Sequence, residues 1–133
     1  MRRCTDDDVP WAMSLFKRRY PNRYDFETTE SWVRNVVLRN PGLSLAVRTA
    51  NAFLAAILIA RPWLPADWEC HVVAVYADFG HTWETVPLLK YSISWAKERK
   101  ASSWRFQSDT GQRIGPLMKR IGAVEESHYK LEL

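Results

Sequence analysis

The chain has 133 residues, of which 47% are hydrophobic and 26% are charged, a length and balance typical of one domain around one core. The formal net charge of +4 permits an acidic partner such as nucleic acid without requiring one. The longest apolar run, residues 52–60, is far shorter than the roughly 20 residues of a membrane-spanning helix. No apolar stretch follows the N-terminal arginines, as a secretory signal would need. We therefore expect a single domain over 1–133 that is cytoplasmic on synthesis, with no membrane insertion.

The first half of the chain predicts a strand, two helices and a hairpin. A short strand at 2–5 is followed by a helix over 9–19, which the acidic residues 6–8 would cap and whose last turn carries cations. A second helix follows, with Thr28 or Thr29 as N-cap and a stop at 40–42. A period of two in the apolar residues predicts a strand at 43–47, which forms a hairpin with the run at 53–60.

The second half predicts a parallel crossover. Residues 61–67 contain two prolines and should form an exposed turn from which Trp63 projects. The elements expected after it are a strand at 68–76, a helix at 86–99, a strand at 103–107, a helix at 112–121 and a strand at 128–133. A strand, helix and strand in succession imply parallel pairing, whereas hairpins are antiparallel. The fold class is α/β, an α+β mixed and mostly antiparallel sheet in the order β-α-α-β-β-β-α-β-α-β.

This order, together with the opening residues 2–8 and the closing residues 119–123, resembles the GNAT superfamily of N-acetyltransferases over nearly the whole chain. In active members the fourth strand runs into a Q/R-x-x-G-x-G/A turn, whose main-chain amides bind the pyrophosphate of acetyl-CoA at a helix N-terminus. The three defining positions fall here on Gly80, Trp83 and Thr85. None of them matches the pattern.

The cofactor loop that the resemblance predicts is therefore degenerate. It consists of Gly80, His81, Thr82, Trp83, Glu84 and Thr85. An indole at position 83 blocks the pyrophosphate unless it swings out, and Pro87 delays the helix start to about Thr85. The Tyr that family enzymes use as a general acid falls on Met118, which cannot donate a proton. We expect no cofactor, or acetyl-CoA if the protein is active.

Two residues on the fourth strand are candidate bases. The resemblance implies that a Glu on this strand can take the proton of the acceptor amine, and Glu69 and His71 share one face under a period of two. Either could serve if its pKa lies near neutrality. The alternative is that both are solvated residues at the edge of the sheet.

The basic and aromatic residues predict an interaction surface. Its candidates are Lys17, Arg18, Arg19, Arg23, Trp63 and Trp83. Arg34 and Arg39 would join the basic cluster if the second helix lies alongside the first. The cluster could bind phosphate or an acidic protein face, or it could only complement the end of its own helix.

The histidines and cysteines do not predict a metal site. His71, His81 and His128 are far apart in the sequence, and Cys4 and Cys70 lack the paired spacing of zinc ligands. We expect no metal, and we interpret both cysteines as small core residues.

Two functions fit these features. In the first, the chain is a GNAT-fold pseudoenzyme, a non-catalytic structural or interaction component of a phage particle, either an internal virion protein or one associated with the head and tail. It resembles small GNAT-like proteins of short-tailed phages, its partners would be other protein subunits, and nucleic acid is a weaker candidate. The alternative is a divergent active acetyl-CoA-dependent N-acyltransferase.

Overall fold

The computed structural model describes residues 1–19, 21, 25–60, 67–106, 119–120, 124–125 and 129–133. These residues contain a seven-stranded sheet in the order β1-β2-β3-β4-β5-β7-β6. The strands are β1 Arg2–Arg3, β2 Ser44–Arg48, β3 Ala52–Ala60, β4 Trp68–Ala77, β5 Ser103–Phe106, β6 Val124–Glu125 and β7 Tyr129–Glu132. The α-helices are α1 Val9–Arg19, α2 Phe26–Trp32 and α3 Thr85–Glu98.

The sheet is mixed, as the sequence predicts. β4 and β5 pair in parallel across the α3 crossover, and the other neighbouring strands pair antiparallel. The expected element order is confirmed from β1 to β5. β6 was not predicted, because two residues are too few to show a period. The helix expected at 112–121 lies outside the described residues except for Lys119 and Arg120, which are helical.

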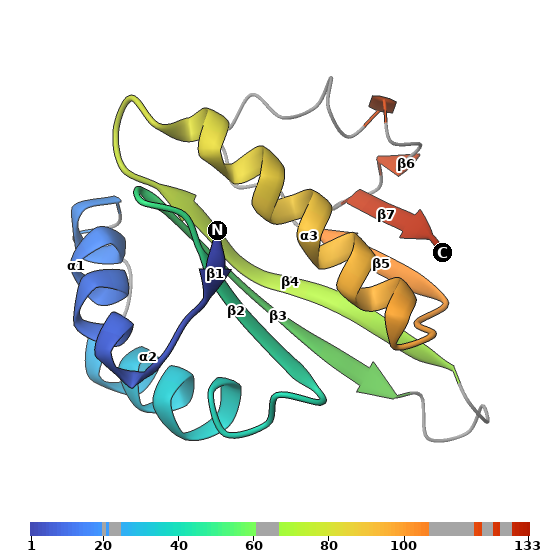
Figure 1. Cartoon of the computed structure of the whole chain (residues 1–133), viewed down its shortest axis with the longest axis horizontal. Coiled ribbons are helices and arrows are strands. Elements are labelled where there is room, and N and C mark those ends of the chain that lie inside the picture. Colours follow the sequence, from blue (N-terminus) through green and yellow to red (C-terminus); the bar gives the residue numbers. More distant parts are fainter. Residues whose placement is uncertain (20, 22–24, 61–66, 107–118, 121–123, 126–128) are drawn as a thin grey trace.

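Helices cover both faces of the sheet (Figure 1). α3 packs on one face, and α1 and α2 pack on the other. The α3 face buries Leu45, Leu54, Cys70, Val75, Leu88 and Trp104, among others. The opposite core includes Val9, Leu15, Phe16, Val37, Phe53 and Tyr76. Both cysteines are free; Cys70 is buried, as predicted, whereas Cys4 is only partly so.

A buried carboxylate anchors the start of α1. Residues 6–8 form a 3-10 turn rather than capping α1 directly, with Thr5 before it. Asp8 accepts hydrogen bonds from the Thr5 N–H at 2.8 Å, from Arg2 at 2.7 Å and from Arg48 at 2.9 Å. The Arg2 guanidinium holds the pKa of the Asp8 carboxyl well below its usual range. Because Arg48 also lies over the ring of Trp11 at 3.5 Å, the N-terminal segment is tied to β2 and to α1 together.

The second helix starts earlier than predicted. Asp25 is the N-cap and accepts the Thr28 N–H at 3.1 Å, so Thr28 is the third residue of α2 rather than its cap. α2 continues into a π-helical turn, Val33–Val37. The wider turn leaves Val36 exposed, although a regular helix would place it with its buried neighbours.

An extra residue in β4 changes which side chains face α3. Cys70 and Val72 pack on the α3 side before the irregularity, and Val75 and Ala77 do so after it. The register with β3 shifts there, so that Ala55 pairs with Ala74 and Ala56 pairs with Val72. Val73 is the additional residue of a β-bulge, which bends and twists the strand locally.

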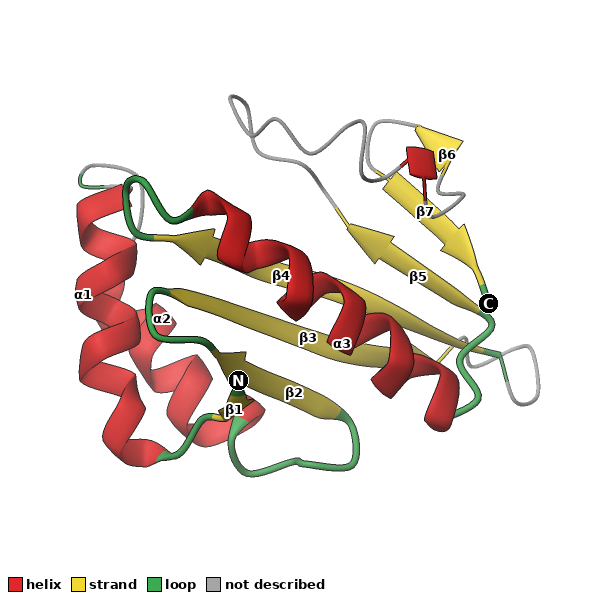
Figure 2. Ribbon diagram, turned by 45° about the horizontal axis from the view of Figure 1, so that its top comes forward, coloured by secondary structure: helices red, strands yellow, loops and turns green. Residues whose placement is uncertain are grey.

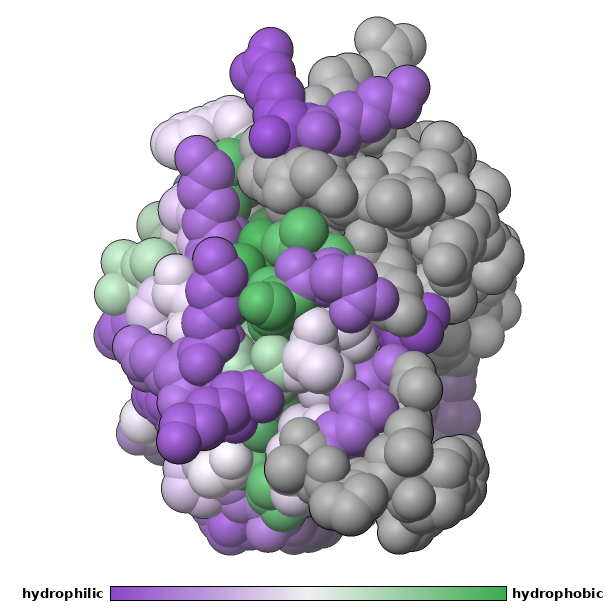
Figure 3. All heavy atoms as spheres, turned by 90° about the vertical axis from the view of Figure 1, so that its right-hand side faces the viewer, coloured by the Kyte–Doolittle hydropathy of each residue, from purple (hydrophilic) through white to green (hydrophobic). Residues whose placement is uncertain are grey.

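Among the described residues on the face shown in Figure 3, many side chains are hydrophilic. Hydrophobic side chains reach this face only in a narrow band between hydrophilic ones. None of the described helices is long and apolar enough to cross a membrane.

A buried hydrogen bond links α3 to β5. The indole N–H of Trp104 donates to the Ser92 hydroxyl at 2.9 Å, and that hydroxyl donates to the Leu89 carbonyl at 2.7 Å. Both side chains are completely buried. Without Ser92 the indole N–H would have no acceptor and no access to water.

Replacing Ser92 with Ala should therefore lower the free energy of unfolding by about 1–3 kcal/mol, the cost of an unsatisfied buried donor. Urea denaturation of the Ser92→Ala variant measures this. Ser94→Ala, two residues along on the exposed side of the same helix, is the matched control and should change stability by no more than about 0.5 kcal/mol. Equal effects of the two variants would contradict the importance of this bond.

Candidate functional site

Three polar side chains meet on the sheet face opposite α3, where β4 lies beside β5. His71 Nε2 is 3.1 Å from Glu69 Oε2, and Arg105 Nε is 3.3 Å from the same oxygen. Glu69 is buried and His71 is partly exposed, with 32% of its side chain accessible. The prediction that Glu69 and His71 share a face is confirmed, but Glu69 is not a solvated edge residue.

The strand register extends this cluster across the sheet. Glu69 pairs with Ile59 on one side and with Ser103 on the other, and His71 pairs with Arg105 in the next row. Ser103 is buried, and within the described chain its hydroxyl has no hydrogen-bond partner. An unsatisfied buried hydroxyl beside a buried carboxylate is unusual in a region that serves only packing.

The pairing of β4 with β5 ends immediately after this cluster. The parallel pairing ends at Val72 and Phe106, one residue before the bulge at Val73, and β4 continues to Ala77. Figure 2 shows β5 ending beside the middle of β4. Among the described strands, β5 pairs with that side of β4 only as far as Val72.

The turn from β4 to α3 uses many of its own amides. The N–H of Phe79 donates to the Asp78 carboxylate, and the N–H groups of His81 and Glu84 donate to carbonyls within the turn at 3.0 Å. A 3-10 turn, Thr82–Glu84, precedes α3. The predicted late helix start at Thr85 is confirmed, and these amides are not available to a phosphate.

A carboxylate of the protein occupies the positive end of α3. Glu84 is buried and accepts hydrogen bonds from the main-chain N–H of Asn51 at 3.1 Å and from its amide at 2.9 Å. His81 Nδ1 lies 3.1 Å away. Hydrogen bonds from Thr49 and Asn51 lower the pKa of Glu84. The N-terminus of α3 is thus fixed to the hairpin between β2 and β3, and its dipole is already complemented.

Trp83 projects from the turn, with 69% of the residue accessible to solvent. The indole therefore points out of the turn, which is the one arrangement in which the sequence analysis expected it not to block a pyrophosphate. Thr85 is buried, and its hydroxyl donates to the Thr82 carbonyl at 2.7 Å. The glycine pattern is absent, and the turn is closed by its own hydrogen bonds.

The basic end of α1 lies beside this turn (Figure 2). Arg18 pairs with Asp78 at 3.1 Å, and the Arg19 guanidinium lies over the ring of Phe79 at 5.2 Å. Lys17 lies over the ring of Phe26 instead. Two candidate regions far apart in sequence are thus neighbours in the fold.

Three of the residues singled out from the sequence, Arg23, Trp63 and Met118, lie outside the described residues.

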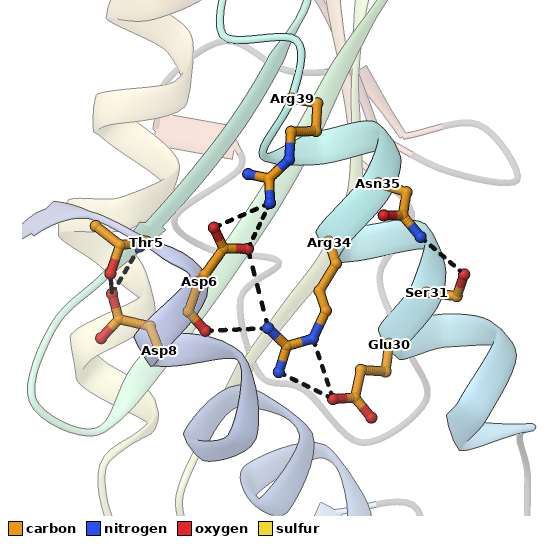
Figure 4. Close-up of polar contacts among 8 residues, drawn as sticks. All are labelled: Thr5, Asp6, Asp8, Glu30, Ser31, Arg34, Asn35 and Arg39. Carbon is orange, nitrogen blue, oxygen red and sulfur yellow. Dashed lines mark hydrogen bonds and ion pairs between the residues drawn. The ribbon is translucent and has the colours of Figure 1, made fainter.

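Arg34 and Arg39 do not join this basic cluster. Both pair with Asp6, at 3.9 Å and 3.0 Å, and Arg34 also pairs with Glu30 at 3.2 Å (Figure 4). These contacts hold the second helix against the start of the chain. The sequence suggestion was wrong, because both arginines point to Asp6 and Arg34 also pairs with Glu30.

The described residues contain no group of three or more His, Cys, Asp or Glu side chains that could hold a metal ion.

Comparison with solved structures identifies the fold. No family model and no curated protein matches the chain. A ribosomal-protein-alanine N-acetyltransferase from Brucella melitensis matches at 17% identity and TM-score 0.70, covering 99% of this chain and 98% of that one. A predicted acetyltransferase from Clostridium acetobutylicum, solved with acetyl-CoA, matches at 18% identity and TM-score 0.72, covering 99% and 93%. A transcriptional regulator from Bacillus halodurans matches at 14% identity and TM-score 0.72, covering 99% and 96%.

The chain therefore has the GNAT acetyltransferase fold. At these identities the similarity establishes the fold alone. None of these three structures is named as a phage protein, so the expected closeness to proteins of short-tailed phages has no support from them.

Sequence reasoning missed three parts of the site. Arg105 was not recognised, because its contact with Glu69 depends on the parallel register of β4 and β5. Phe79 was treated only as a turn residue, although 63% of it is exposed. The role of Glu84 was also missed, since its partners belong to a hairpin more than thirty residues earlier.

The Glu84 contacts predict a pH-dependent stability. A carboxyl whose pKa is lowered by folding stabilises the folded state above its ordinary value of 4.5, and this contribution is lost as the pH falls below it. Glu84→Gln should therefore reduce the free energy of unfolding at about pH 7 by about 1 kcal/mol or more, and the difference from the unmodified protein should shrink towards about pH 3.

Urea denaturation at several pH values tests this, with Glu98→Gln as control, because the Glu98 side chain is 76% exposed. A difference that stays constant from neutral to acid pH would contradict the role assigned to Glu84.

Proposed function

We propose that the protein is an N-acyltransferase, which transfers an acyl group from a pantetheine thioester such as acetyl-CoA to an amine. The observation that carries this proposal is the cluster of Glu69, His71 and Arg105, with its buried carboxylate, beside the point where the pairing of β4 with β5 ends. The GNAT fold and the acetyl-CoA present in the Clostridium acetobutylicum structure support the same reaction class.

We infer different roles for the three side chains. An ionised carboxylate only accepts hydrogen bonds, so the contact with Glu69 requires that His71 Nε2 donates. The neutral imidazole then has its lone pair on Nδ1, which makes His71 the base and Glu69 the group that selects its tautomer. Arg105 pairs with Glu69 and keeps that carboxylate in place.

In the proposed reaction the amine nitrogen attacks the thioester carbonyl carbon. A C–N bond forms, the C–S bond breaks, and His71 Nδ1 takes the proton that the amine loses. The leaving thiolate has an ordinary pKa of about 8.5, so its departure near neutral pH needs little help from a general acid. Activity therefore does not require a Tyr at position 118, where this chain has Met.

A second candidate function is favoured by the turn at 80–85. Trp83 and Thr85 replace the glycines, and several amides of the turn are used internally. A non-catalytic interaction protein needs no donor site and would explain both features. It would not explain the cluster of Glu69, His71 and Arg105.

His71→Ala should lower kcat by about 10²–10⁴-fold, the range for loss of a general base. The assay measures thiol release from acetyl-CoA and from acetyl-pantetheine with a panel of amines containing amino acids, peptides and polyamines. Arg105→Lys should give a smaller decrease and a shifted pH profile, because a lysine cannot reproduce the contacts of a guanidinium with Glu69.

Lys90→Ala, on the exposed side of α3, should leave the rate unchanged. Amine-dependent thiol release that survives in His71→Ala would contradict the role of His71. The absence of release with either donor would favour the non-catalytic candidate.

A further inference from the structure

Two isoleucines of β3 lie beside the polar pair on β4 and have no part in the proposed proton transfer. In the antiparallel register Ile57 pairs with His71, and Ile59 pairs with Glu69. Directly paired residues of antiparallel strands have their side chains on the same face, about 4.5–5.5 Å apart at Cβ. Ile57 is half-buried and Ile59 is 41% exposed. Neither belongs to the two hydrophobic cores that the described residues form.

This part of the sheet extends beyond the helices that cover the same face. Ala55, two residues before Ile57 on β3, packs in the core beneath α1 and α2. Figure 1 shows the end of β3 and the start of β4 continuing past both helices. Apolar side chains around a few polar groups are typical of sites for small molecules. The isoleucines are therefore candidates for contact with a substrate held at His71.

The two sides of the polar pair differ in chemical character. On the β5 side, Arg105 Nε is 3.3 Å from Glu69 Oε2. On the other side, β3 carries Ile57 and Ile59. An amine whose nitrogen contacts His71 therefore has a cationic neighbour towards β5 and apolar neighbours towards β3. A substituent without charge is best accommodated along β3.

A second cationic group on the acceptor is not matched at this site. The Glu69 carboxylate is contacted by both His71 and Arg105, and the guanidinium of Arg105 repels another cation. Isoleucine side chains offer no hydrogen-bond acceptor, so an ammonium group placed on them would lose contacts with water and gain none. Methylene groups placed there would instead remove apolar surface from water, which is favourable.

The apolar strip formed by Ile57 and Ile59 is narrow. Neighbouring strands lie about 4.8 Å apart, and two residues of a strand span about 7 Å. On the far side of β3, the polar residue Ser44 of β2 is paired with Ile57. The strip therefore has the width of one alkyl chain or one aromatic ring.

We propose that the acceptor is a monoamine with one apolar substituent, an alkyl chain or a single ring, which lies along Ile57 and Ile59 while the nitrogen contacts His71. This inference depends on the proposed N-acyltransferase function and specifies its acceptor. The bonds made and broken are those of the proposed reaction. Ile57 and Ile59 determine specificity and take no part in the proton transfer.

Three matched amines test the acceptor in the thiol-release assay with the full chain. They are ethylamine, pentylamine and cadaverine, which is pentylamine with a second amine at its other end. The kcat/KM of pentylamine should exceed that of ethylamine by about tenfold or more, because three further methylene groups contact the isoleucines. It should exceed that of cadaverine by about tenfold or more as well, although cadaverine has two reactive ends.

Two variants of Ile59 locate the contact. Ile59→Ala should raise the KM of pentylamine by about threefold or more and change kcat little, because the lost surface binds the substituent. Ile59→Asp should shift the preference towards cadaverine by about threefold or more, since an exposed carboxylate can pair with the second ammonium. A gain with cadaverine cannot result from misfolding.

Leu43→Ala is the matched control and should leave all three kcat/KM values unchanged. Leu43 is 47% exposed and follows Gly42, whose carbonyl accepts a hydrogen bond from Arg99 at the end of α3 at 3.2 Å. Urea denaturation shows whether each variant is folded. Preferences that are the same in Ile59→Ala, Ile59→Asp and the unmodified protein overturn the assignment of Ile59.

The outcomes separate the two proposals. Turnover of ethylamine or cadaverine that equals or exceeds turnover of pentylamine leaves the N-acyltransferase function standing and rejects the apolar acceptor. Failure of every amine, including the amino acids and peptides of the wider panel, rejects the N-acyltransferase function and the acceptor with it.

Discussion

Val73, the extra residue in β4, controls which side chains of that strand face α3 and which face the opposite side. Ala74 and Tyr76, which follow Val73 in the chain, pack against α1 and α2. Glu69 and His71, which precede Val73, lie on that same face of the sheet. Strict alternation counted back from Tyr76 would place Glu69 and His71 under α3 instead. A carboxylate and an imidazole would then lie in an apolar core, at a large cost in desolvation. The bulge therefore allows one face of β4 to carry the core residues Ala74 and Tyr76 in one half of the strand and the polar residues Glu69 and His71 in the other.

The two halves of β4 also differ in what surrounds them. The C-terminal half is held by Tyr76, whose hydroxyl donates to the Ala12 carbonyl of α1 at 3.1 Å. The N-terminal half is paired with β5, which brings Arg105 and Ser103 beside Glu69. Pairing with β5 ends where the bulge begins. The bulge, the end of the pairing with β5 and the polar cluster thus coincide within a few residues of β4.

The β4–α3 turn and the polar cluster differ in how far their polar groups are satisfied internally. The turn uses the N–H groups of Phe79, His81 and Glu84 in its own hydrogen bonds. Beside the buried Glu69, in contrast, the buried Ser103 hydroxyl has no hydrogen-bond partner among the described residues. Because a buried polar group without a partner costs stability, packing explains the turn better than it explains the cluster.

The sequence by itself determined the order of the elements, the mixed sheet and the pairing of Glu69 with His71 on one face. These depend on local periodicity and on the direction of chain crossovers, which are readable from neighbouring residues. It also showed correctly that the glycine pattern is missing. It placed the start of α2 too late, because Asp25 as a cap competes with Thr28 in the same short stretch.

Only the tertiary structure decided which distant residues meet. The contact of Arg105 with Glu69 depends on the parallel register of β4 and β5. The pairing of Arg34 and Arg39 with Asp6 depends on how the second helix packs against the start of the chain. The approach of Arg19 to Phe79 depends on where α1 ends. The reason is physical: periodicity specifies the face of an element, whereas contacts between elements depend on register, bulges and helix packing, which the chain determines only as a whole.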